Sequence, residues 1–312
     1  MRALACPASL KGALSATEAA AALASGFRLA GVEVDECPIA DGGEGTAEVL
    51  FAALGGEWRE AVVDDPLGRP IRARWLLLPN RVAVVESAEA IGLGVLAERE
   101  PLRASSRGLG ELMRAARGEW PAGLVVGLGG SATVDGGAGM REVLSSLPAG
   151  TVALCDVRTR LGDAARLYGP QKGATPEDVQ KLGRRLAGMQ DLAPFAEQPG
   201  SGSAGGLGAA FAALGARLVP GASYVLELIR FRERLRGVTL AVSGEGTLDE
   251  TTTEGKAPWR ARLACEQEGV RCALFGGRVE LDAPDVHALS GEPLRVRADL
   301  RGLALELARR KF

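Results

Sequence analysis

Residues 32–46 read VEVDECPIADGGEGT, a short strand followed by a loop that places two carboxylates on a backbone of glycines. Apolar residues recur along 32–39, which predicts a strand. Open α/β sheets bind ligands at the carboxyl ends of their strands. Asp41 and Glu44 follow this strand directly, so the stretch predicts an α/β fold with a ligand site at that edge of the sheet.

Two further stretches, residues 124–139 and 240–249, repeat the order of apolar strand, glycines, hydroxyl and carboxylate. Glycine lets backbone N–H groups approach an anion, and carboxylates suit a hard cation such as Mg²⁺. Residues 9–12 and 169–174 add a lysine each, on turns that precede predicted helices. These patterns together indicate phosphoryl transfer.

The composition argues against several classes of protein. The chain has 312 residues, 46% of them hydrophobic, and a formal charge of -2, which suits a soluble enzyme and gives no reason to expect nucleic acid. No apolar stretch approaches the roughly 20 residues that span a bilayer, and we expect a cytoplasmic protein. Because His287 is the only histidine, carboxylates and lysines are left for acid–base chemistry. The five cysteines have no C-x-x-C spacing and are expected to be buried thiols.

The order of elements predicts one domain inserted into another. Strands and helices alternate in residues 1–58 and again in 237–312, where strands are expected at 239–243, 270–275 and 294–296. We therefore expect a flavodoxin-like, doubly wound, parallel five-stranded domain of strand order 2-1-3-4-5. Residues 59–236 begin with hairpin strands and continue with helices, which predicts an inserted mixed α/β domain. The residues expected to converge where the strand order reverses are Ser9, Lys11, Asp41, Glu245 and Asp249.

Two motifs admit other interpretations. Residues 127–132, GLGGSA, fit the loose G-x-G-x-x-A pattern of dinucleotide sites, with Asp156 a little over 20 residues on. An NAD(P)-dependent oxidoreductase of a small hydroxy acid is therefore an alternative. Residues 255–258, GKAP, suggest a Walker A motif, but Glu250 stands where that motif needs glycine, so the P-loop is absent.

The motifs taken together closely resemble those of the bacterial class I glycerate kinases. They cover essentially the whole chain, at residues 9–12, 40–46, 129–138, 169–175, 205–210, 244–246 and 255–258. The resemblance implies phosphorylation of D-glycerate by ATP with Mg²⁺, with 2-phosphoglycerate as the favoured product. It also implies an active site in the cleft between a flavodoxin-like domain and a second α/β domain.

Residue type and expected position then assign roles to individual side chains. Asp41 is the candidate general base, with Lys11 and Asp249 as further catalytic residues. The substrate is assigned to Ser9, Lys11, Glu44 and Asp156. The ATP phosphates are assigned to Gly129, Gly130, Ser131, Thr133, Lys172 and Lys256. Mg²⁺ is assigned to Asp135, Glu245 and Asp249.

At three places the chain departs from the family pattern and lacks polar side chains that the family usually has. The family usually has aspartate at the position of Ala8, asparagine at Val134, and Asn-Pro at Arg158-Thr159. The stretch between Met140 and Ala153 is also shorter than the family norm, which predicts a lost strand or a trimmed surface flap. These departures leave a non-catalytic, ligand-binding relative as a third interpretation.

Overall fold

The computed structural model describes residues 2–119, 121–155 and 159–310, which fold as two compact units. Unit 1 comprises Met1–Asp41, Glu48–Ala53 and Ala222–Phe312, and unit 2 comprises Gly42–Ala47 and Leu54–Gly221. Residues 222–236, expected in the inserted domain, group with unit 1. One reason is that Arg234 Nη1 donates to Asp35 Oδ1 at 3.3 Å and to the Glu36 carbonyl at 3.1 Å.

Unit 1 is built on a five-stranded parallel sheet of order β11-β10-β9-β1-β2. Numbered along the chain within this sheet, the order is 2-1-3-4-5, so the predicted flavodoxin-like fold is confirmed. The strands are β1 (Arg2–Ala5), β2 (Glu33–Glu36), β9 (Leu240–Leu248), β10 (Arg271–Val279) and β11 (Val286–Ala288).

The predicted strand at 294–296 is wrong. The fifth strand is β11 instead, which pairs Leu274 of β10 with Val286. Leu294 is fully exposed, and the last helix already begins at Val296. A short apolar run that stays in solvent gains nothing from pairing with the sheet edge.

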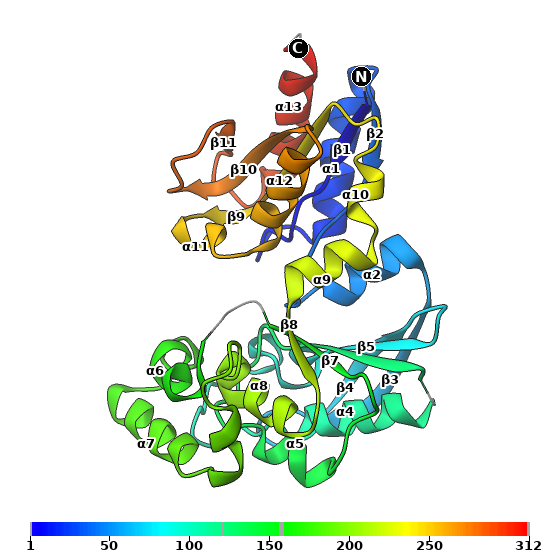
Figure 1. The fold of residues 1–312 in the computed structure, drawn as a ribbon. Helices are drawn as coiled ribbons and strands as arrows, with labels where there is room; N and C mark the ends of the chain where they lie inside the picture. Colours follow the sequence, from blue (N-terminus) through cyan, green and yellow to red (C-terminus); the bar gives the residue numbers. More distant parts are fainter. Residues whose placement is uncertain (1, 120, 156–158, 311–312) are drawn as a thin grey trace. The chain divides into compact units, whose positions relative to one another are not determined.

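Helices cover both faces of this sheet (Figure 1). Helices α1 (Ala16–Leu29) and α13 (Val296–Arg309) pack together, and their apolar sides form one core with alternate residues of β1, β9 and β10. Helix α12 (Ala257–Gln267) packs on β9 and β10. The remaining helices are α2 (Thr46–Leu54), α9 (Gly221–Leu228), α10 (Phe231–Arg234) and α11 (Glu250–Thr253). The predicted capping box of α1 is confirmed, because Glu18 N donates to Ser15 Oγ at 3.2 Å and Ser15 N to Glu18 Oε2 at 3.0 Å.

Unit 2 is built on a six-stranded mixed sheet of order β3-β4-β5-β6-β7-β8. The β3–β4 and β4–β5 pairs are antiparallel hairpins, as predicted, and the pairs from β5 to β8 are parallel. The strands are β3 (Glu57–Asp64), β4 (Pro70–Leu77), β5 (Val82–Glu86), β6 (Gly123–Gly127), β7 (Val152–Cys155) and β8 (Arg217–Pro220).

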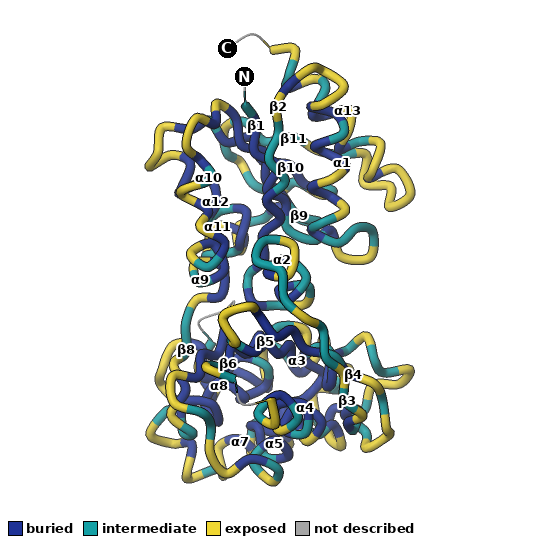
Figure 2. The backbone as a smooth tube through the Cα atoms, turned by 90° about the vertical axis from the view of Figure 1, so that its right-hand side faces the viewer, coloured by how far each residue is buried: buried dark blue, intermediate teal, exposed yellow. Residues whose placement is uncertain are grey.

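The helices of unit 2 surround a second buried core, seen as dark segments of the tube in Figure 2. They are α3 (Ser87–Ile91), α4 (Arg107–Gly118), α5 (Ala138–Val143), α6 (Ala164–Tyr168), α7 (Pro176–Ala187) and α8 (Ser203–Ala213), with 3₁₀ turns at Leu93–Val95, Leu161–Asp163, Pro170–Lys172 and Gln190–Phe195. Residues 144–151, where the chain looked short, join α5 to β7 without a strand or helix. No helix in the described part of the chain combines the length and apolarity needed to cross a membrane.

Candidate active site

Unit 1 brings the turn after β1 beside the end of β9, where the strand order reverses. Cys6 N donates to the Val242 carbonyl and Ala8 N to the Gly244 carbonyl, both at 2.8 Å. Ser9 and exposed Lys11 follow in a turn that Leu10 and Leu14 close with a bridge. A Cβ at Gly246 would come within 3.8 Å of Lys11 N, so this turn lies against the β9 segment that carries Glu245.

Four side chains at the end of β9 form the group that we call the β9 cluster, namely Glu245, Asp249, Thr252 and Lys256. Lys256 Nζ lies 3.5 Å from Glu245 Oε1 and 3.7 Å from Asp249 Oδ1. Thr252 donates from Oγ1 to Glu245 Oε1 at 3.1 Å and from its backbone N–H to Asp249 Oδ1 at 3.2 Å. Asp249 caps the short helix α11, and Lys256 precedes α12 directly. Two helix starts thus hold both carboxylates close to one ammonium.

The two carboxylates of this cluster have pKa values shifted in opposite directions. Burial raises the pKa of Glu245 above its ordinary value of 4.5, and the negative charge of Asp41 adds to that rise, whereas Lys256 and Thr252 oppose it. The hydrogen bond from Thr251 lowers the pKa of Asp249, and Lys256 contributes in the same direction. Half-buried Asp41 therefore lies near enough to Glu245 for their charges to interact.

In unit 2, the glycines of the acidic loop pack directly on the glycines that follow β6. Gly129 N donates to the Gly42 carbonyl at 3.3 Å. A Cβ on Gly129 would stand 2.5 Å from Gly43 Cα, closer than carbon atoms approach without bonding, so this contact requires glycine. Glu44 is exposed, with its Cβ about 4.0 Å from where a Gly130 side chain would begin. Two motifs far apart in the sequence thereby share one surface.

Glu86, which the sequence analysis missed, holds the acidic loop in place. Its buried carboxylate accepts hydrogen bonds from Gly45 N at 3.1 Å and from Ala47 N at 2.5 Å, where α2 begins. A carboxylate at a helix N-terminus satisfies N–H groups that have no partner within the helix. Glu86 ends the apolar strand β5, and a charged residue at the carboxyl end of a buried strand is the signal that could have identified it.

Lys172 is buried beneath the loop that follows β6. Its ammonium donates to Ser131 Oγ at 3.1 Å and to the Thr133 carbonyl at 2.7 Å. Thr133 Oγ1 is also buried, and it has no hydrogen-bond partner among the described residues. A buried hydroxyl is costly without a hydrogen-bond partner. The unpartnered Thr133 hydroxyl, next to a loop that the positively charged Lys172 contacts, favours an anion at Ser131 and Thr133.

The glycine motif at residues 205–210 supports the same loop from α8. A Cβ on Gly205 would lie 2.1 Å from the Thr133 carbonyl oxygen and 2.6 Å from Val134 Cα, so only glycine permits this contact. Val134 itself is fully buried in the apolar core of unit 2. An apolar side chain suits that environment, which accounts for this departure from the family pattern.

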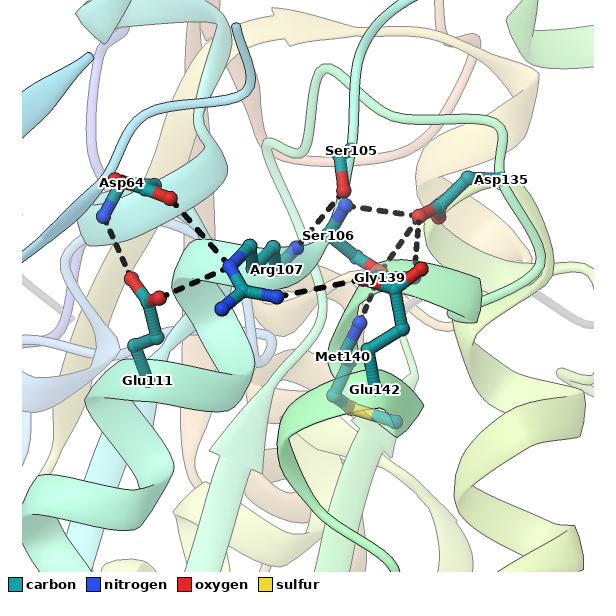
Figure 3. A network of polar contacts seen from close by, with 9 residues as sticks. All are labelled: Asp64, Ser105, Ser106, Arg107, Glu111, Asp135, Gly139, Met140 and Glu142. Carbon is teal, nitrogen blue, oxygen red and sulfur yellow. Dashed lines mark hydrogen bonds and ion pairs between the residues drawn. The ribbon is translucent and has the colours of Figure 1, made fainter. Parts of the chain in front are cut away.

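Asp135 fastens the loop to the start of α4, as Figure 3 shows. Its carboxylate accepts hydrogen bonds from Ser106 N at 2.8 Å, Ser106 Oγ at 2.7 Å, Gly137 N at 3.1 Å and Gly139 N at 3.1 Å. Ser106 Oγ in turn accepts from Met140 N at 2.9 Å. Four donors occupy the acceptor sites of one carboxylate. The geometry therefore favours a loop-holding role for Asp135 over the predicted role of metal ligand.

Two further expectations concern Asp156 and a metal centre. Asp156 lies outside the described residues, as does Arg158. Within residues 2–119, 121–155 and 159–310, no group of three or more histidine, cysteine, aspartate or glutamate side chains is arranged to hold a metal ion.

All five cysteines are buried, as predicted.

The dinucleotide interpretation of residues 127–132 lacks its structural context. That fingerprint needs a helix to start at the glycines, where its N-terminus meets the pyrophosphate. Strand β6 ends at Gly127, and α5 begins only at Ala138, after the whole loop 128–137. The loop geometry argues against the nicotinamide alternative.

Comparisons with known proteins agree with the fold and the motifs. A crystal structure of a candidate glycerate kinase 2 from Salmonella typhimurium LT2 matches with a TM-score of 0.83 and 31% identity, over 99% of this chain and 97% of that one. The Bacillus subtilis (strain 168) protein named glycerate kinase is 34% identical over 92% of this chain and 87% of its own length. The Escherichia coli (strain K12) protein named glycerate 2-kinase is 35% identical over 83% of this chain and 80% of its own.

These likenesses define an enzyme of the kinase class built from two α/β units. A sequence model of the glycerate kinase family matches residues 3–150 and 145–292. The chain belongs to the glycerate kinase family, and the resemblance inferred from its motifs is confirmed.

Proposed function

We propose that this enzyme transfers a phosphoryl group from ATP to D-glycerate in the presence of Mg²⁺, with 2-phosphoglycerate as the favoured product. The observation that carries the proposal is the buried Lys172 ammonium beside the unpartnered Thr133 hydroxyl. Family membership supports the reaction class, and the Escherichia coli relative is named for phosphorylation at position 2.

The residues of the loop after β6 fit a phosphate group. Ser131 Oγ already accepts from Lys172, so its own proton is available to an anion, and Thr133 Oγ1 offers a second buried donor. The backbone N–H group of Gly130 adds a donor of the kind that cradles phosphates, whereas Gly129 donates its N–H to the Gly42 carbonyl and allows the close approach of the two loops. We assign the ATP phosphates to Gly129, Gly130, Ser131, Thr133 and Lys172. ATP supplies the phosphoryl group that is transferred.

The β9 cluster fits a magnesium ion held in the way that this ion is held in phosphoryl transferases. Mg²⁺ keeps most of its water and takes one or two protein carboxylates together with substrate phosphates. Glu245 and Asp249 provide two carboxylates, and their proximity to Lys256 shows that they already attract a positive charge. We assign Lys256, which lies beside both carboxylates, to a phosphate oxygen of ATP.

Glycerate is assigned to the turn of Ser9 and Lys11, to Glu44 and to Asp156. The substrate carboxylate would pair with the exposed Lys11 ammonium, and Ser9 would bind it as a hydrogen-bond donor. Asp41 would take the proton from the attacking hydroxyl, since its half-buried carboxylate lies near Glu245 in the glycine-rich acidic loop. Positioning and charge neutralisation supply most of the catalysis in phosphoryl transfer.

The test is a coupled assay with D-glycerate, ATP and Mg²⁺, followed by NMR identification of the product. We expect phosphoglycerate to form with Mg²⁺ and formation to stop in EDTA. Turnover that persists in EDTA, or no turnover across a panel of small hydroxy acids, would contradict the kinase proposal. Binding of glycerate without turnover would identify a non-catalytic relative, and stabilisation by NAD(P)H but not by Mg-ATP would restore the oxidoreductase interpretation.

We place the reaction in the cytoplasm, with small molecules and no nucleic acid as partners. The support for this placement is chemical. Buried cysteines that remain thiols are typical of a reducing compartment. A formal charge of -2 provides no electrostatic attraction for a polyanion.

A further inference from the structure

A cavity of about 460 Å³ lies within unit 1 among α9, α10 and α12. Figure 2 shows these three helices on one side of the strands of unit 1, away from α1 and α13. Leu226, Phe231, Leu263 and Ala264 give the cavity an apolar wall. Its volume falls in the range of roughly 300–1,000 Å³ that is usual for small-molecule sites. No role proposed above uses this cavity.

Two of the three arginines that line the cavity are beside or paired with a glutamate. Arg230 lies 3.8 Å from Glu233, and Arg232 pairs with Glu268 at 2.9 Å. Arg260 lines the cavity and makes no ion pair with any described residue. Its Nε is buried beside Gly255 without a hydrogen-bond partner, so an anion in the cavity would have to reach the rest of the guanidinium group. An arginine without an ion pair is a suitable partner for a carboxylate or phosphate oxygen.

The backbone at the rim of the cavity is held in a strained conformation. Arg230 has φ of 54° and ψ of 44°, in the left-handed region that residues other than glycine rarely adopt. Such strain persists only where the surrounding structure imposes it, and it gathers at ligand sites. The turn between α9 and α10 thereby presents Phe231 to the cavity from a fixed position.

We propose that this cavity is a second small-molecule site, which takes a singly charged organic anion with an aromatic or apolar body. The anionic group pairs with Arg260, and the body lies on Phe231, Leu226 and Leu263. A single charge is expected because Arg260 is the one lining arginine without an ion pair among the described residues, since Arg230 lies beside Glu233 and Arg232 pairs with Glu268. A second negative charge on the ligand would face Glu227 and Glu233 without compensation.

This site is distinct from the β9 cluster, although the same helix serves both. Lys256 directs its ammonium to Glu245 and Asp249, whereas Arg260 comes one helical turn later and lines the cavity with Leu263 and Gln267. The proposal does not depend on the identity of the phosphorylated substrate. Its test therefore measures binding and not activity.

The experiment uses the full chain and two probes, benzoate and phenyl phosphate, with ligand-observed NMR and calorimetry to measure Kd. We expect benzoate to bind, benzyl alcohol to bind at least about tenfold more weakly, and Arg260→Gln to weaken benzoate by a similar factor. Arg301→Gln, at an exposed position of helix α13, is the matched control and should leave Kd unchanged. Phenyl phosphate, which carries nearly two negative charges at neutral pH, should bind more weakly than benzoate, and tighter binding of phenyl phosphate would overturn the assignment of a singly charged ligand.

Several outcomes would overturn this proposal. Equal binding of benzoate by the native chain and the folded Arg260→Gln variant would do so, as would displacement of benzoate by ATP or glycerate. If Arg260→Gln fails to fold, Arg260→Lys preserves a positive charge and provides the second variant. It should still bind benzoate more tightly than benzyl alcohol, and equal affinity for the two probes would reject the site.

Discussion

The Lys256 ammonium lies 3.5 Å from the Glu245 carboxylate, at the point where β9 and α12 approach each other. This ion pair only partly offsets the burial of Glu245, because the pKa of that carboxyl remains raised. Asp249, 3.7 Å from the same ammonium, is more exposed and has a lowered pKa. One lysine therefore lies close to two carboxylates whose pKa values are shifted in opposite directions.

The first prediction follows from the sign of these two shifts. The folded protein binds a proton at Glu245 more tightly than the unfolded chain does, so the contribution of Glu245 to stability is greatest below pH 4.5 and is lost as pH rises through the raised pKa. Replacing it by Glu245→Gln removes this loss. We expect the Tm of the variant, relative to the native Tm, to increase as pH rises above 4.5.

Asp249→Asn provides the opposite control for that experiment. The lowered pKa of Asp249 contributes stability above its ordinary value of 3.8, and this contribution disappears as pH falls through the lowered pKa. The Tm of Asp249→Asn relative to the native protein should therefore decrease as pH rises. Thermal unfolding of both variants between acid and neutral pH measures the two slopes. Parallel slopes would show that the opposed shifts are wrong.

The second prediction concerns the hydroxyl of Thr133. Because Oγ1 is buried without a partner, Thr133→Val should leave Tm unchanged or raise it, while the KM for ATP rises about tenfold through loss of a phosphate contact. Thr151→Val is the control, since Thr151 Oγ1 donates to the Pro148 carbonyl at 2.7 Å. That variant should lose Tm and keep its KM for ATP. An unchanged KM in Thr133→Val would remove Thr133 from the phosphate site.

The third prediction assigns a positioning role to Glu86. Glu86→Gln leaves one oxygen for the N–H groups of Gly45 and Ala47 and places an amide N–H against the other donor. We expect kcat to fall about tenfold, with little change in the KM for ATP. The matched control is Glu89→Gln. Glu89 lies on helix α3 and accepts a hydrogen bond from Arg74, so this variant should lower Tm while kcat stays normal. A fall in Tm alone in Glu86→Gln would reduce its role to folding.

The sequence was sufficient for features that depend on local or repetitive patterns. The capping box of Ser15 and Glu18 is set by residues three apart, and the parallel sheet of unit 1 was predictable because its strands alternate with helices. The hairpins of unit 2 were predictable because turn residues separate short apolar strands. The motif residues of the candidate site were proposed from the same kind of local pattern.

Contacts between distant residues account for what the sequence did not reveal. Glu86 reaches a loop 41 residues before it, and Arg234 bonds Asp35 across 199 residues. The Asp135 carboxylate accepts two of its hydrogen bonds from Ser106, and Ser106 belongs to no motif. Strand β11 has three residues at a sheet edge, too few for a periodic pattern to distinguish it from a loop.

The last prediction tests Asp41 as the general base. Asp41→Asn keeps the size of the side chain but removes its charge and basicity, and loss of a general base typically costs about 10²–10⁴ in rate. We expect kcat to fall by at least about the lower figure, while calorimetry shows little change in ATP binding. Asp282→Asn, at an exposed position, is the control and should be indistinguishable from the native enzyme. A lowered Tm with near-normal kcat would instead make Asp41 structural and move the base to Asp249.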